Sequence, residues 1–87
     1  MSTDYETVLD AVDTAASDLA AEPSVDTVAR YIAAVLLAGP CDYTRLLSLT
    51  PLRPIPGFMI RDACAQLETS GAVTVSGVYE TYRLAVS

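Results

Sequence analysis

Hydrophobic residues recur along the first two thirds of the chain at the three- and four-residue spacing of amphipathic helices. The first predicted helix runs from Asp4 to Leu19, and Thr3 with Glu6 matches the capping-box pattern at its start. Its apolar face comprises Tyr5, Val8, Leu9, Val12, Ala15, Ala16 and Leu19. A second helix is predicted from the N-cap residue Ser24 to about Ala38, where Gly39-Pro40 ends it. This helix is apolar nearly all round apart from an Asp26–Arg30 pair, so we expect it to be central and buried.

Two further helices are predicted on either side of a proline-rich segment. Asp42 is expected to cap a short helix over Tyr43 to Leu49, whose buried residues are Leu46, Leu47 and Leu49. The prolines of "TPLRPIPG" exclude a helix there. The last helix is expected over Phe58 to Ser70 and ends at Gly71. Its predicted buried face comprises Phe58, Ile60, Ala63, Cys64 and Leu67.

The pattern changes to alternation after Gly71, which predicts strands. Val73 and Val75 alternate with polar residues, and a second alternating strand covers Thr81 to Val86. The segment "SGVYE" is short enough to join the two as a hairpin. The predicted fold class is therefore mostly α with a C-terminal β-hairpin (α+β): four helices and then two antiparallel strands. The expected core is Val28, Ile32, Leu36, Leu46, Ile60, Leu67, Val75 and Leu84.

Length and composition favour a single domain. The 87 residues are 52% hydrophobic, which is ample for a core. Residues 1–22 would form an acidic helix, and residues 24–87 the rest of the domain. The net charge of −6 is uneven: residues 1–29 carry seven acids and no base, whereas residues 30–87 carry five arginines against four acids. The acidity thus belongs to the N-terminal third.

Several classes of chemistry find no support in these residues. The chain has no histidine, and Cys41 and Cys64 lie too far apart for an ordinary zinc site, so we expect two buried or half-buried, reduced thiols. There is no glycine-rich phosphate loop, and the acids lie on an exposed helix face. We therefore expect no enzyme, metal or cofactor. The acidic N-terminus is unlike a signal peptide, and no apolar run spans a membrane, so the expected location is cytoplasmic.

The pattern "IRDACAQLETSGAVTV…YRLAV" resembles the recognition helix, glycine stop and wing strands of the winged-helix family of helix-turn-helix domains, and the resemblance covers residues 24–87. It implies a recognition helix, Phe58 to Ser70, lying in a DNA major groove. The residues that would then contact nucleic acid are Arg45, Arg53, Arg61, Gln66 and Arg83. In such proteins an added N-terminal helix often builds a dimer, so a homodimer through Val8, Leu9, Val12, Ala16 and Leu19 is expected, unless this face covers its own domain.

Charge opposes DNA binding. DNA affinity comes largely from neutralised phosphates, yet the expected recognition helix offers Arg61 alone against Asp62 and Glu68. The turn before that helix is also about twice the usual three or four residues. Ordinary surface pairing of Arg45, Arg61 and Arg83 with nearby acids is the alternative to DNA contact. Weak or no binding to duplex DNA is the expectation.

Two functions remain. The first is a non-enzymatic protein-binding module that presents Glu6, Asp10 and Asp13, spaced like phosphates, to a basic partner surface, as an anti-CRISPR or anti-restriction inhibitor from a phage or mobile element does. Val78 and Tyr79 at the wing tip would also contact the partner, unless the tip folds back on the body. The same three acids can instead form a solvated face that keeps the chain soluble. The alternative function is a dimeric winged-helix DNA-binding transcription regulator.

Overall fold

The computed structural model describes residues 5–85 and arranges them as four α-helices, one 3₁₀-helix and a three-stranded sheet. In chain order the elements are α1 (Tyr5–Ala21), α2 (Val25–Leu36), β1 (Cys41–Asp42), α3 (Tyr43–Leu47), η1 (Thr50–Leu52), α4 (Gly57–Thr69), β2 (Val73–Ser76) and β3 (Thr81–Leu84). Thr3, Asp4 and Val86, which the sequence placed in the first helix start and the last strand, lie outside the described residues. Within residues 5–85, no helix is long and apolar enough to cross a membrane.

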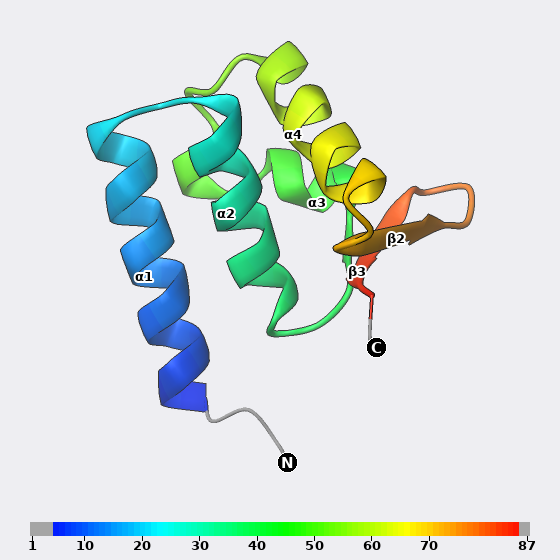
Figure 1. Ribbon diagram of the computed structural model, residues 1–87, viewed down its shortest axis with the longest axis horizontal. Coiled ribbons are helices and arrows are strands. Elements are labelled where there is room, and N and C mark those ends of the chain that lie inside the picture. Colours follow the sequence, from blue (N-terminus) through cyan, green and yellow to red (C-terminus); the bar gives the residue numbers. More distant parts are fainter. Residues whose placement is uncertain (1–4, 86–87) are drawn as a thin grey trace.

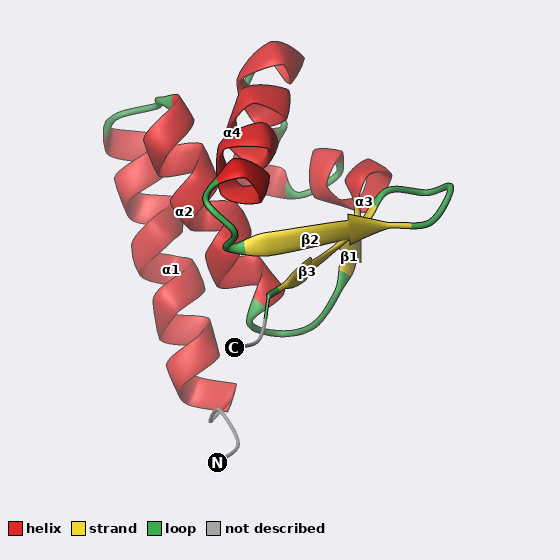
Figure 2. Cartoon of the chain, turned by 45° about the vertical axis from the view of Figure 1, so that its right-hand side comes forward, coloured by secondary structure: helices red, strands yellow, loops and turns green. Residues whose placement is uncertain are grey.

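α2 is the central helix, as its nearly all-round apolar pattern predicted. It packs against antiparallel α1 on one side and against α4 on the other (Figure 1). The sheet packs against α2 and α4 on the side away from α1, so α1 and the β2–β3 hairpin occupy opposite sides of the molecule (Figure 2). The acidic helix α1 and the β2–β3 hairpin therefore do not share a surface.

Local signals at the helix ends explain the boundaries. The Thr27 N–H donates to the Ser24 side chain at 3.1 Å, and the Ser24 N–H donates to Thr27 Oγ1 at 2.9 Å, which is a capping box with threonine in place of glutamate. At the end of α4, Gly71 adopts a φ of 81°. The Ala72 N–H then bonds the Leu67 carbonyl at 3.0 Å, the bond that defines a Schellman motif.

The sheet has one strand more than expected. Its order is β1-β3-β2 and both pairs are antiparallel. Tyr82 of β3 stands opposite Val75 of β2 and opposite Cys41 of β1. The strand β1 is two residues long, too short to show alternation, so the sequence pattern did not reveal it.

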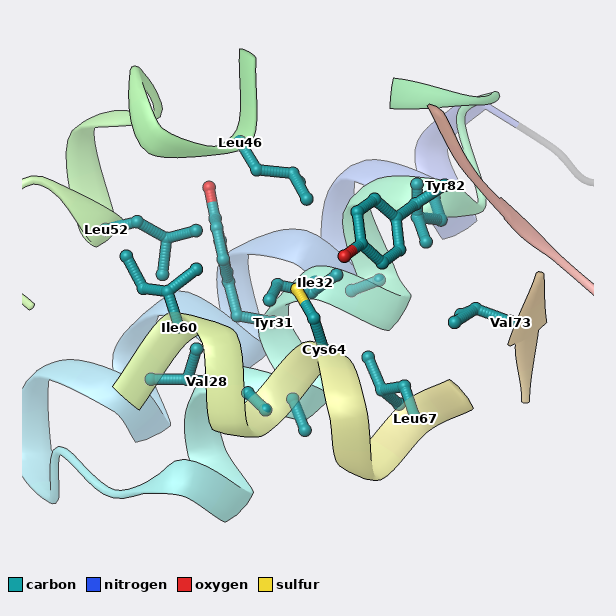
Figure 3. Packing of buried hydrophobic residues seen from close by; sticks show 14 of the residues in the cluster. Val28, Tyr31, Ile32, Leu46, Leu52, Ile60, Cys64, Leu67, Val73 and Tyr82 are labelled. Atoms are coloured by element: carbon teal, nitrogen blue, oxygen red, sulfur yellow. The ribbon is translucent and has the colours of Figure 1, made fainter. Parts of the chain in front are cut away.

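The core lies where α2, α4 and the sheet meet (Figure 3). Six of the eight expected core residues are buried: Val28, Ile32, Leu36, Leu46, Ile60 and Leu67. Val75 and Leu84 are only half-buried and pack against the core edge. Tyr82, from the same strand as Leu84, is the buried residue, and its hydroxyl points toward the Cys64 thiol (Figure 3).

Several residues expected to be buried are exposed, and helix geometry gives the reason. Phe58 is 68% exposed because it lies two residues before Ile60, on the opposite side of α4. Leu47 is turned about 100° away from buried Leu46. On α1, Tyr5 and Leu9 are exposed, since only the narrower face around Val8, Ala15 and Leu19 reaches α2. Leu49 follows the end of α3 and is half-buried.

The proline-rich segment and the cap of α3 also differ from the expectation. The segment is not wholly irregular, because η1 spans Thr50–Leu52 with Pro51 near its start, where a missing N–H costs nothing. Asp42 occupies the N-cap position of α3 but makes no side-chain capping bond. Its Oδ1 instead accepts a hydrogen bond from the Thr81 hydroxyl at 2.7 Å, which joins β1 to β3.

Candidate functional site

The three acids singled out in the sequence form an exposed row on α1. Glu6, Asp10 and Asp13, here called the acidic row, are all solvent-exposed. No arginine or lysine occurs in α1, and among residues 5–85 the ion pairs are Asp26–Arg30 and Glu80–Arg61. Neighbouring members lie three or four residues apart, which places their Cβ atoms about 5–6 Å from each other. The row is therefore a line of uncompensated negative charge.

Arg61, the base of the expected recognition helix, is engaged within the molecule. Its guanidinium donates two hydrogen bonds to the Glu80 carboxylate, at 2.6 and 3.2 Å, and lies 3.9 Å from the centroid of the Tyr43 ring. This pairing holds the pKa of Glu80 below its ordinary value and raises the pKa of Arg61. The Glu80 carbonyl also accepts from the Tyr43 N–H at 3.1 Å. One residue of the hairpin thus joins α3 and α4.

The sequence did not reveal this cluster, since Arg61 and Glu80 lie 19 residues apart. Glu80 also has a φ of 52°, a left-handed conformation that is uncommon for residues other than glycine. No local pattern indicates that the chain turns in this way there. The result is that the Nη1–Nη2 edge of the guanidinium and one of its faces already have partners.

The other candidate nucleic-acid contacts are exposed but lie on different elements. Arg45 belongs to α3, Arg53 follows η1, and Arg83 lies on β3. Gln66 shares α4 with Arg61, yet a separation of five residues turns the two side chains about 140° apart. The five candidates therefore come from four segments, and the side chains of Arg61 and Gln66 on α4 point in different directions.

The wing tip is exposed, as the partner-contact interpretation expected. Val78 is 93% exposed and Tyr79 is 76% exposed, so the tip does not fold back on the body. The tip lies on the opposite side of the molecule from α1 (Figures 1 and 2). The acidic row and the wing tip consequently form two separate surfaces rather than one.

An apolar groove lies beside the C-terminal half of α1. Its volume is about 340 Å³, and its walls include Ala16, Leu19 and Ala20 of α1 together with Pro51, Pro54 and Ile55 of the proline-rich segment. Every residue that lines it is alanine, leucine, isoleucine or proline, so no polar side chain is available to orient a small polar ligand. Sequence reasoning treated the prolines only as a helix break and did not bring them next to α1.

The thiols are poor nucleophiles. Burial raises the pKa of Cys41 and of Cys64, which keeps both protonated near neutral pH. Cys41 borders a second hollow of about 280 Å³ beside Arg45, whose charge opposes the effect of burial on the thiol pKa only in part. Among residues 5–85, no group of three or more histidine, cysteine, aspartate or glutamate side chains is placed to hold a metal ion.

The face expected to form a homodimer is largely used within the chain. Val8 and Leu19 are buried against the rest of the domain, and Val12 and Ala16 are half-buried. Leu9 alone of these five residues remains exposed. This packing follows the alternative in which α1 covers its own domain, while the oligomeric state itself stays a prediction for light scattering.

A scan against protein-family models, a search of curated proteins and a search of solved structures each found no match.

Proposed function

We propose that this chain is a non-enzymatic protein-binding module that presents the acidic row of α1 to a basic surface of a partner. The observation that carries the proposal is the row itself: three exposed carboxylates, on a helix without a base, that make no ion pair among the described residues. Exposed acids of one sign attract a basic partner and speed its association. A protein surface that normally holds nucleic acid is the partner chemistry that fits, which makes an inhibitor that occupies such a surface the biological role.

The state of Arg61 supports the same function. A recognition helix binds DNA through bases that reach phosphates and base edges. Here the guanidinium is committed to Glu80 and Tyr43, and releasing it would leave the Glu80 carboxylate beside the approaching phosphates. The wing therefore supplies an acid where DNA binding would require a base.

The scaffold we propose is a winged helix. Three helices, α2, α3 and α4, precede the hairpin in the expected order, and β1 adds a short strand that ties α3 to the wing. This order also favours the second candidate function, a dimeric DNA-binding regulator, because the scaffold is typical of that class. Charge favours the protein-binding module, since a fold hosts many functions and the function has to be argued from the site.

Two matched charge reversals test the proposal. The double variant Glu6→Arg with Asp10→Arg reverses the charge of two members of the acidic row. The control, Asp62→Arg with Glu68→Arg, makes the same change in net charge at two exposed positions of α4. Each variant and the unmodified chain serve as bait for an extract of the native host, and the retained material is scored for protein and for DNA. Glu6 lies in the first turn of α1, where a negative charge stabilises the helix, so its reversal can weaken the fold. Circular dichroism melting of both variants is therefore the folding control.

The expected result is one basic protein retained by the unmodified chain and by the α4 variant, but lost by the α1 variant. Equal loss in both variants would show that net charge alone governs retention and would contradict a binding site on α1. Retention of DNA by the unmodified chain, strengthened by the α1 variant, would favour the regulator instead.

A further inference from the structure

The groove beside α1 and the acidic row belong to one continuous surface. On a helix, residues seven apart lie two turns from each other on nearly the same side. Glu6, Asp13 and Ala20 are related in this way, and so are Leu9 and Ala16. An acidic line and an apolar line thus run side by side along α1, and both reach the groove, where Ala16 and Ala20 form part of its wall.

The groove is suited to an apolar side chain. Its lining carries no polar side chain, and four of the lining residues are prolines, whose fixed φ leaves little conformational freedom to lose on binding. Leu9 is exposed on the same flank, about 10 Å along the helix axis from Ala16. That distance matches two successive anchors, i and i+7, on a helix lying against α1.

We propose that a basic amphipathic helix of the partner binds along this flank, with one apolar residue inserted in the groove, a second against Leu9, and its lysines or arginines against the acidic row. The inference rests on the proposed function and names the chemistry of the partner segment. Charge selects this occupant over a second copy of the chain, which would bring its own acidic row, and over nucleic acid, which is repelled by the row. Arg53, although close in sequence, does not line the groove.

Filling the groove tests this inference separately from the charge reversal. Ala20→Trp places an indole on a groove-lining position, and Ala21→Trp places the same group on the next exposed residue of α1, which does not line the groove. The probe is a synthetic helix-forming peptide with leucines at i, i+3, i+4 and i+7 and lysines elsewhere. Its binding is followed by calorimetry, and a peptide with glutamate in place of lysine is the charge control.

We expect Ala20→Trp to weaken binding of the lysine peptide by about tenfold or more, and Ala21→Trp to leave it unchanged. On the unmodified chain, the NMR methyl signals of Ala16 and Ile55 should shift with the lysine peptide and not with the glutamate peptide, which keeps the test valid if Ala20→Trp fails to fold. Equal affinity of the two tryptophan variants, or unshifted methyl signals, would overturn the inference. Dimerisation of the unmodified chain that Ala20→Trp abolishes would overturn it in favour of a second copy.

The two experiments fail in different ways. If reversal of Glu6 and Asp10 abolishes capture of the host protein while Ala20→Trp has no effect on the peptide, the groove inference is wrong and the proposed function stands. If Ala20→Trp blocks the peptide while reversal of the acidic row leaves capture of the host protein intact, the groove is a binding site and the proposed role of the row is wrong.

Discussion

Two neighbouring leucines of α3 show how the direction of a side chain determines its contribution to stability. Leu46 is fully buried against the core, whereas Leu47 is 39% exposed. Both residues are leucines of the same helix, so the difference in burial comes from the rotation of about 100° between successive residues. A substitution at each position therefore measures packing with the chemistry held constant.

Leu46→Ala should lower the free energy of unfolding by about 2–5 kcal/mol, because it removes buried methyl groups and leaves a cavity. Leu47→Ala should cost about 1 kcal/mol or less, since much of its side chain already contacts water. Urea denaturation followed by circular dichroism measures both. Similar losses in the two variants would contradict the orientation of α3.

At the scale of elements, the parts that sequence predicted well are those with local causes. Ser24 caps the start of α2, and Gly71 terminates α4 with a left-handed conformation. Both helix boundaries could be predicted because each of these residues acts within a few positions of the boundary. Phe58 was misassigned although its spacing from Ile60 already placed it on the opposite side of α4. That error came from giving hydrophobicity more weight than helix period.

The contacts between elements were beyond sequence reasoning. The two-residue strand β1 pairs with a strand some 40 positions later, and no periodic signal accompanies so short an element. The Arg61–Glu80 pair and the groove beside α1 likewise depend on how separate segments pack. The acidic row could be predicted, because its residues share one helix, but its separation from the wing tip could not.

The Arg61–Glu80 pair also gives a pH prediction at this scale, because it links the hairpin to α4. The folded-state pKa of Glu80 is lowered, chiefly by its hydrogen bonds from Arg61. Its stabilising effect is therefore present above the unfolded pKa of about 4.3 and is lost as pH falls through the lower folded value. Because both side chains are partly exposed, added salt should weaken the effect.

An NMR titration of the Glu80 carboxyl carbon should give a midpoint below the ordinary glutamate value. Arg61→Gln should move that midpoint upward, whereas Arg45→Gln, a change at an exposed arginine of α3, should leave it in place. A Glu80 midpoint that is the same with and without Arg61 would show that the pair does not persist in solution.

At the scale of the whole molecule, α1 and the β2–β3 hairpin lie on opposite sides (Figure 2). The helix carries acids and no base, whereas Glu80 of the hairpin is paired with Arg61. With a net charge of −6, the approach to DNA is repulsive within about a Debye length, roughly 8 Å at physiological salt. We propose that this helix-and-hairpin fold contacts protein rather than DNA.

The most direct test is the affinity of the unmodified chain for labelled duplex DNA at physiological salt, measured by fluorescence anisotropy. We expect a dissociation constant weaker than about 10⁻⁴ M, beyond the usual range of non-specific DNA binders, with no preference for any sequence. Arg61→Ala should change nothing, because Arg61 is already paired with Glu80. Tight, sequence-selective binding that disappears in Arg61→Ala would contradict the proposal that this chain contacts protein rather than DNA.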